Sequence, residues 1–352
     1  MRGRYVGFMK IARAALLLIA LLIPAFAADA SMLRSTAERA QPDDPGYRAL
    51  AAAANAVVGV KVKALPNARS NETLGAERSG SGILIRDDGL ILTIGYLIME
   101  ADQVEVTDSF GTTVPASIVA YDHATGFGLV KTLARISPKP IRMGSSAPVG
   151  QMDRLMIVTG GDEQTISIAT VVSKRQFAGY WEYLIKDAIF TAPPRLDHSG
   201  AALINKDGEL VGVGSLLVMD ALTPGERLPG NMFVPVDLLK PVLDEMIRTG
   251  GQKGASRPWL GVNSLEEDGR VKVMHVNEES PADKAGVVPG DIILSVDGEP
   301  VDTLAKFYGK LWRPGAKPGS EVHLTLLHGV GMKEVTVRSI DRREFMRTKP
   351  TV

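Results

Sequence analysis

The sequence Thr-Ala-Pro-Pro-Arg-Leu-Asp-His-Ser-Gly-Ala-Ala-Leu, residues 191–203, joins two apolar segments, residues 183–190 and 201–204. Gly200 is the flexible residue that a sharp backbone reversal needs, and Ser199 precedes it. A serine on such a turn is a nucleophile when a base takes its proton and backbone N–H groups stabilise the oxyanion. Asp, Ser and Gly are equally typical of an ordinary β-turn. The rest of the chain must decide between these two interpretations.

Short apolar segments at close spacing surround this turn, from residues 57–62 to residues 232–234. Turn pairs such as Asp88-Gly89 separate them. Many short strands divided by turns are typical of a β-barrel or a β-sandwich. The pattern therefore predicts a mainly β domain over residues 55–248.

Other segments interrupt or follow this pattern. Residues 66–78 are polar and predict a loop, whereas residues 236–248 have helical periodicity. Residues 249–257 have the composition of a linker. A second, smaller unit of strands and a helix is predicted over residues 258–342, and residues 343–352 are predicted to form a frayed tail.

The N-terminus has the pattern of a secretory signal peptide. In residues 1–27, a basic start precedes a short apolar run and a small-residue cleavage site ending at Ala27. Cleavage after Ala30 fits nearly as well, and an uncleaved membrane anchor is the alternative. Residues 28–54 are predicted to form a mobile N-terminal segment that ends in a helix-prone stretch. We expect an exported protein of the periplasm or cell envelope.

The amino-acid composition limits the classes of function that this chain can have. The 352 residues include 40 Lys and Arg, 40 Asp and Glu, and no Cys. Removing residues 1–27 leaves 36 basic and 40 acidic side chains, which does not favour binding to nucleic acid. An exported chain without cysteine relies on a packed core rather than on disulfides. No spaced His or Asp cluster predicts a metal site, and no motif predicts a cofactor.

Several motifs together resemble one family. Gly-Ser-Gly-Ile-Leu-Ile at residues 80–85, Asp-His-Ala-Thr-Gly at residues 122–126 and Asp-His-Ser-Gly at residues 197–200 resemble the catalytic segments of HtrA/DegP-type serine proteases. Residues 285–293, with the pattern Ala-Gly-x-x-x-Gly-Asp-x-Ile, resemble the core of a PDZ domain. The resemblance implies a trypsin-like double β-barrel followed by a small α/β PDZ domain.

The resemblance fails at the positions where catalysis needs particular residues. Tyr96 occupies the place of the catalytic histidine, and Gly126 occupies the place of the aspartate that orients it. Ser199 remains as a nucleophile without its partners. Asp197 stands where the family has a glycine that contributes an oxyanion N–H, and we expect its charge to oppose a developing oxyanion.

No other residue of the sequence is expected to replace the missing base. A free tyrosine has a pKa of about 10 and is protonated at neutral pH, so Tyr96 is a poor base. His198 is next to Ser199, and its side chain is expected to project away from the hydroxyl. His123 is expected on a surface turn.

The PDZ-like unit keeps the features of a peptide site. Trp259-Leu260-Gly261-Val262 matches the family's carboxylate-binding loop, in which backbone N–H groups hold a peptide C-terminus. The resemblance implies that an extended peptide adds a strand beside this loop. The alternative is a domain that docks only against its own barrel or a neighbouring subunit.

These observations predict an exported HtrA-like pseudoprotease that acts as a peptide-binding scaffold, a chaperone-like subunit or a regulator of an active relative. Its expected partners are peptide C-termini and unfolded or envelope proteins. A homo-oligomer such as the family's trimer, or a hetero-assembly with an active relative, is also expected. The alternatives are an active serine endopeptidase with an unconventional base and a structural subunit of an envelope complex.

Overall fold

The computed structural model describes residues 44–161, 163–251 and 256–347. The predicted signal peptide and most of the predicted mobile segment lie outside these residues. Contacts divide the chain after Ala49 into two units, and the strands described below all belong to the second unit. Within the described residues, no helix combines the length and the apolar character needed to cross a membrane.

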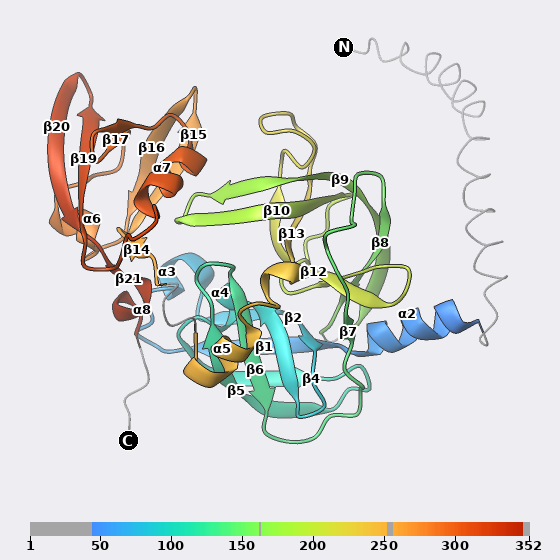
Figure 1. The fold of residues 1–352 in the computed structure, drawn as a ribbon. Coiled ribbons are helices and arrows are strands. Elements are labelled where there is room, and N and C mark those ends of the chain that lie inside the picture. Colours follow the sequence, from blue (N-terminus) through green and yellow to red (C-terminus); the bar gives the residue numbers. More distant parts are fainter. Residues whose placement is uncertain (1–43, 162, 252–255, 348–352) are drawn as a thin grey trace, which may run out of the picture. The chain divides into compact units, whose positions relative to one another are not determined.

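The first part of the second unit is a closed barrel with the strand order β1-β2-β3-β6-β5-β4 (Figure 1). Each of its neighbouring pairs is antiparallel. Helix α2 (Pro45–Asn55) precedes it. Its strands are β1 (Val57–Ala64), β2 (Glu77–Leu84), β3 (Leu90–Ile94), β4 (Ala101–Thr107), β5 (Thr113–Tyr121) and β6 (Phe127–Thr132).

The second part of this unit is a seven-stranded sheet with the order β11-β8-β9-β10-β13-β12-β7. The pairing of β11 with β12 closes it into a second barrel. β9 and β10 form its longest hairpin (Figure 1). The strands are β7 (Arg142–Met143), β8 (Arg154–Thr159), β9 (Thr165–Gly179), β10 (Tyr183–Ala192), β11 (Ala202–Ile204), β12 (Glu209–Val218) and β13 (Gly230–Pro235).

The C-terminal domain is a sheet with the order β15-β16-β17-β19-β20, on which helix α7 packs. A separate pair, β14 with β21, joins the two ends of this domain. The elements are β14 (Pro258–Trp259), β15 (Val262–Glu267), β16 (Arg270–Val276), α6 (Pro281–Lys284), β17 (Ile292–Val296), β18 (Glu299–Pro300), α7 (Leu304–Leu311), β19 (Glu321–His328), β20 (Gly331–Arg338), β21 (Ile340–Asp341) and α8 (Arg342–Phe345).

Three local predictions were wrong. The predicted loop at residues 66–78 contains the short helix α3 (Asn71–Leu74) and the start of β2. The predicted helix at residues 236–248 is split into the 3₁₀ turn η1 (Val236–Leu238) and α5 (Leu243–Thr249), because Pro241 between them cannot donate a helical hydrogen bond.

The predicted frayed tail begins with ordered structure. Helix α8 follows β21 directly, and the Phe345 ring packs 4.7 Å from the Trp259 ring. The guanidinium of Arg69 lies 4.1 Å from the centre of the same Phe345 ring. Aromatic and cation–π contacts of this kind stabilise a short terminal helix that has little propensity of its own. Residues 348–352 lie outside the described part of the chain.

The turn that carries Ser199 is fixed by close backbone contacts with both barrels. The Ser199 carbonyl accepts a hydrogen bond from Ser81 N–H of β2 at 2.8 Å, and Gly200 N–H donates to Gly214 of β12 at 2.9 Å. Gly200 has a left-handed φ of 74°, and a Cβ there would overlap the Ser81 carbonyl oxygen. Only glycine satisfies both constraints, so the sequence pattern Ser-Gly is a requirement of the fold.

We predict that Gly200→Ala destabilises the protein by at least about 3 kcal/mol, because it adds a backbone clash to left-handed strain. Gly225→Ala is the matched control, since Gly225 has a φ of 82° and open space around its Cβ position. The control isolates the conformational cost of about 1 kcal/mol. Chemical unfolding measures both changes, and equal losses in the two variants would contradict the packing argument.

Candidate functional site

The Ser199 hydroxyl has a phenol as its hydrogen-bond partner. The hydroxyl oxygens of Ser199 and Tyr96 lie 2.7 Å apart, and the Tyr96 hydroxyl also donates to the Ser215 carbonyl at 2.8 Å. Tyr96 belongs to the short helix α4 (Gly95–Ile98), which follows β3. The structure therefore brings together two of the predicted site residues, Tyr96 and Ser199.

The pKa of the Tyr96 phenol determines whether it can take the proton of Ser199. Desolvation of the phenol raises the pKa of Tyr96 to about 12, although the hydrogen bond with Ser199 acts in the opposite direction. A phenol has one hydrogen and the Ser215 carbonyl can only accept. When the phenol donates to Ser215, its oxygen is free to accept the Ser199 hydrogen. This geometry holds the serine hydroxyl in place, but the phenolate that would remove its proton is not formed at neutral pH.

Gly126, at the position of the family's aspartate, faces the side chain of another residue. It has a left-handed φ of 77°, and a Cβ there would lie 2.7 Å from the Tyr183 hydroxyl. That hydroxyl donates to the Thr125 carbonyl at 2.7 Å. Burial raises the pKa of Tyr183 well above its usual value, so this phenol also stays neutral. Tyr183 therefore fills the space beside Gly126.

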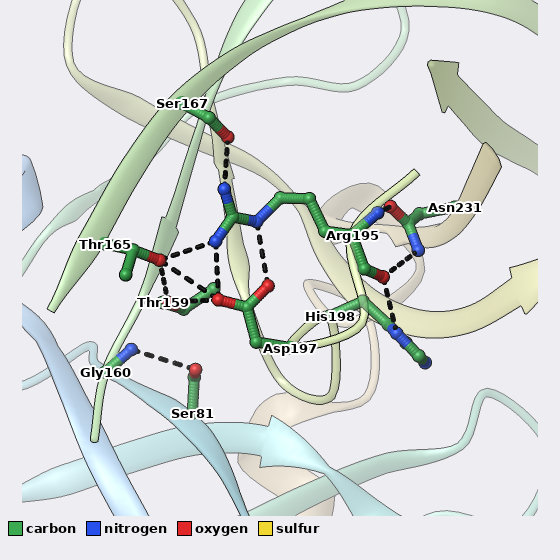
Figure 2. A network of polar contacts seen from close by, with 9 residues as sticks. All are labelled: Ser81, Thr159, Gly160, Thr165, Ser167, Arg195, Asp197, His198 and Asn231. Atoms are coloured by element: carbon green, nitrogen blue, oxygen red, sulfur yellow. Dashed lines mark hydrogen bonds and ion pairs between the residues drawn. The ribbon is translucent and has the colours of Figure 1, made fainter. Parts of the chain in front are cut away.

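The carboxylate of Asp197 belongs to a compact polar network (Figure 2). It accepts hydrogen bonds from Arg195 Nε at 2.9 Å, from Thr159 at 3.1 Å and from Thr165 at 3.0 Å. Partial burial opposes its ionisation, but the Arg195 hydrogen bond and charge outweigh burial and lower the pKa of Asp197. The ion pair with Arg195 compensates the negative charge that we expected to oppose an oxyanion. That electrostatic expectation was too strong.

The two histidines of the barrels also have other partners. His198 Nδ1 lies 3.0 Å from the Arg195 carbonyl, and burial lowers the pKa of His198 (Figure 2). His123 was expected on a surface turn, but its ring packs 4.2 Å from the Tyr121 ring. Burial lowers the pKa of His123 to about 3, with the Arg342 charge acting in the same direction.

A cleft of about 240 Å³ opens beside this site. Tyr96, Gly126, Trp181, Tyr183 and His198 line it. Aromatic walls with a few polar groups are typical of a binding cleft. Among the described residues, no group of His, Asp or Glu side chains is placed to hold a metal ion.

The predicted carboxylate-binding loop holds a side-chain carboxylate of this same chain. Glu182 accepts hydrogen bonds from the backbone N–H groups of Leu260 at 3.1 Å, Gly261 at 2.7 Å and Val262 at 3.1 Å. Gly261 has a φ of 88°, which turns neighbouring N–H groups towards one point. The loop can therefore bind a carboxylate. Trp259 contributes differently, because its ring packs against Phe345.

Sequence reasoning missed Glu182 and Tyr183. Glu182 ends the turn of a hairpin and Tyr183 begins the next strand, and neither residue has a motif around it. Their partners lie far away in the chain, at residues 260–262 and at residues 125–126. The one available signal was the aromatic run Tyr-Trp-Glu-Tyr at residues 180–183, which is unusual for a solvent-exposed turn.

Glu182 predicts a pH dependence of stability. Burial raises the pKa of Glu182 from 4.5 to about 7, although the three N–H donors and Arg342 favour the ionised form. Between these values the folded chain holds a proton that the unfolded chain has lost, so the free energy of unfolding falls as pH rises through this window. Glu182→Gln cannot titrate and is the reference. The melting temperature of the wild type relative to Glu182→Gln should decline from pH 4.5 to pH 7; a constant difference would contradict the assignment.

Comparison with known proteins agrees with this architecture. A family model described as a trypsin-like peptidase domain matches residues 80–213, and a PDZ domain model matches residues 258–338. The structure resembles the HtrA-type protease AlgW solved with a decapeptide, with a TM-score of 0.51 and 20% identity over 87% of this chain and 99% of that chain. It also resembles a serine endoprotease from Yersinia pestis, with a TM-score of 0.50 and 24% identity over 84% and 97% of the two chains.

Two curated relatives extend the likeness to the sequence. Serine endoprotease DegS of Haemophilus influenzae is 30% identical over 291 residues, which cover 78% of this chain and 81% of that protein. A probable periplasmic serine endoprotease DegP-like of Pseudomonas fulva is 28% identical over 70% of this chain. The match spans 53% of that second relative, about half its length. The predicted trypsin-like double barrel with a PDZ domain is confirmed, and the chain belongs to the HtrA family of serine proteases.

Proposed function

We propose that this chain is an HtrA-family pseudoprotease, exported to the periplasm, that binds the C-termini of other proteins through its PDZ domain. The observation that carries the proposal is the 2.7 Å hydrogen bond between Ser199 and Tyr96. It places a phenol with a pKa of about 12 where a proton acceptor is required. A serine hydroxyl without a base is a weak nucleophile.

The surroundings of the pair support the same conclusion. A histidine base needs a second group to orient it and to stabilise its charged form. Gly126 has no side chain, and Tyr183 occupies the space beside it. Of the five histidines in the chain, His123 and His198 lie in the barrel domain, and both are held by other contacts. Among the described residues of the barrel domain, no histidine is therefore placed to act as the base for Ser199.

The binding role is supported by the loop at residues 260–262. Its three N–H groups converge on a carboxylate, which is the group that ends every unmodified peptide chain. The basic and apolar start of residues 1–27 and the periplasmic relatives support export. Exported proteins with accessible C-termini are thus the proposed ligands of residues 258–342, and an active relative is a proposed partner in a larger assembly.

One observation favours a second function, that of an active serine endopeptidase. Ser199 is kept on a correctly formed turn, and the relatives described above are named endoproteases. In such an enzyme, Tyr96 would orient the Ser199 hydroxyl, and the substrate or solvent would accept its proton. The two functions differ in one measurable property, which is hydrolysis that depends on Ser199.

We predict that the full chain does not hydrolyse a labelled unfolded protein at pH 7.5 faster than Ser199→Ala does. The reason is that no group near the hydroxyl takes its proton at this pH. The released label is measured over several hours, with an active protease as the positive control. Cleavage that disappears in Ser199→Ala would establish the endopeptidase and overturn the pseudoprotease. Equal background in both proteins supports the proposal.

A second prediction concerns restoration of the triad. Tyr96→His alone should give no measurable hydrolysis, because Gly126 cannot orient the imidazole. Adding Gly126→Asp should lower the melting temperature without activity, since the new Cβ meets Tyr183. Gly111→Asp is the matched control, with a φ of 86° and open space around the Cβ position. Robust hydrolysis by Tyr96→His alone would show that the rest of the site is intact.

A further inference from the structure

The tip of the β9–β10 hairpin occupies the carboxylate-binding loop of the PDZ domain. Three residues, Tyr180, Trp181 and Glu182, connect the two strands. The Glu182 side chain is 5% exposed, and its carboxylate is held by three consecutive backbone N–H groups. A buried carboxylate is stable only when hydrogen bonds replace its water, and this loop supplies them.

The backbone at this position is not what a hairpin turn would select. Glu182 has a left-handed φ of 58°, at the last position of a three-residue loop. Glycine and asparagine are favoured at that position, and other residues cost about 1 kcal/mol or more there. The conformation of the turn therefore does not explain why residue 182 is a glutamate. The contacts of its carboxylate explain it.

The hairpin also makes the backbone contact that an added peptide strand would make. Ser264 N–H of β15 donates to the Tyr180 carbonyl at 2.7 Å. A peptide that extends a sheet edge is held by main-chain hydrogen bonds of this kind, together with a pocket for its terminal group. Tyr180 and Glu182 thus reproduce both parts of peptide recognition within one chain.

Contacts with helix α7 hold the hairpin in this position. The Tyr308 hydroxyl donates to the Gly179 carbonyl at 2.6 Å and accepts the Glu182 N–H at 3.1 Å. Ala178 and Leu184, on either side of the loop, pack against the apolar core of the PDZ domain. The hairpin is therefore anchored through its backbone and its side chains, and not only through the carboxylate.

We propose that Glu182 is a built-in ligand of the PDZ domain, which occupies the carboxylate loop and must leave before a free peptide C-terminus can bind. The proposal rests on the proposed function for the identity of the external ligand. The two carboxylates compete for the same three N–H groups, so they cannot bind together. The bound hairpin keeps the site closed until a competing chain end displaces it.

This competition should change the apparent dissociation constant of the peptide by a measurable factor. When only a fraction of the molecules is open, the apparent dissociation constant rises in inverse proportion to that fraction. An open state that is a few kcal/mol less stable has a population of about 0.1–10%. Removing the Glu182 carboxylate should therefore tighten peptide binding by at least about tenfold.

The first test needs no external ligand. Amide hydrogen exchange of residues 258–264, followed by mass spectrometry in the full chain, reports whether Glu182 protects the loop. Glu182→Asn replaces the carboxylate by a shorter, uncharged side chain that does not reach the loop. Asparagine also suits the left-handed turn, so the hairpin can still fold. Glu182→Gln keeps the length and removes the charge. Glu182→Asn should exchange at least about tenfold faster than the wild type over these residues, whereas Glu182→Gln, whose carbonyl oxygen can accept the same N–H groups, should exchange more slowly than Glu182→Asn. Unchanged exchange in Glu182→Asn would overturn the built-in ligand.

The second test measures competition. A fluorescent decapeptide ending in Ala-Leu-Val with a free carboxylate is titrated into the wild type and both variants, and its C-terminal amide is titrated in parallel. Binding of the acid should tighten at least about tenfold in Glu182→Asn and less in Glu182→Gln, whereas the amide should gain nothing. Tyr308→Phe, which loosens the hairpin and leaves Glu182 intact, should tighten acid binding less. Glu226→Gln, at an exposed loop position, is the control and should match the wild type.

The outcomes separate this inference from the proposed function. Faster exchange in the variants without peptide binding would support the built-in ligand, and would overturn peptide binding as the function. Equal acid binding by the wild type and the variants would support peptide binding, and would overturn the competition. Equal binding of acid and amide peptides would show that the loop does not select a chain end.

Discussion

The turn at Ser199 and Gly200 is held by a close backbone contact with β2. Ser81 donates to the Ser199 carbonyl, and its own carbonyl leaves no room for a Cβ at residue 200. This contact fixes the position of the serine hydroxyl without reference to catalysis. The turn that a protease uses for its nucleophile is therefore also a structural joint. Its role in the fold does not depend on catalysis, because disrupting the turn would disturb both barrels.

Tyr96 and Tyr183 show how buried backbone carbonyls beside Ser199 and Gly126 are satisfied. An empty polar cleft would leave buried carbonyls without partners, which costs free energy. Tyr96 donates to the Ser215 carbonyl, and Tyr183 donates to the Thr125 carbonyl. Each phenol fills volume and satisfies one backbone acceptor while remaining neutral. The two neutral phenols thus contribute packing and hydrogen bonding to this part of the barrel domain.

The sequence was sufficient where structure depends on local chemistry. Alternating apolar residues predicted the strands, and the Ser-Gly pair predicted the tight turn at residue 199. It was insufficient where a partner comes from another part of the chain. The charge of Asp197 was judged alone, but two distant threonines at the ends of β8 and β9 donate to its carboxylate, beside the nearby Arg195. The tail was expected to be frayed, but the Phe345 ring packs against the Trp259 ring. Tertiary contacts override local preference in both cases.

The hairpin between β9 and β10 joins the two sites through adjacent residues. Glu182 lies in the PDZ loop, and Tyr183, the next residue, fills the space beside Gly126. Trp181 stacks on the Tyr183 ring at 5.3 Å and lines the same cleft as Tyr96. Successive residues of one chain cannot move independently over such short distances, because their backbones share a peptide bond. A strained residue that persists against local preference often marks a functional constraint. The contacts of Glu182 and Tyr183 therefore connect the PDZ loop and the serine cleft through adjacent residues of one hairpin.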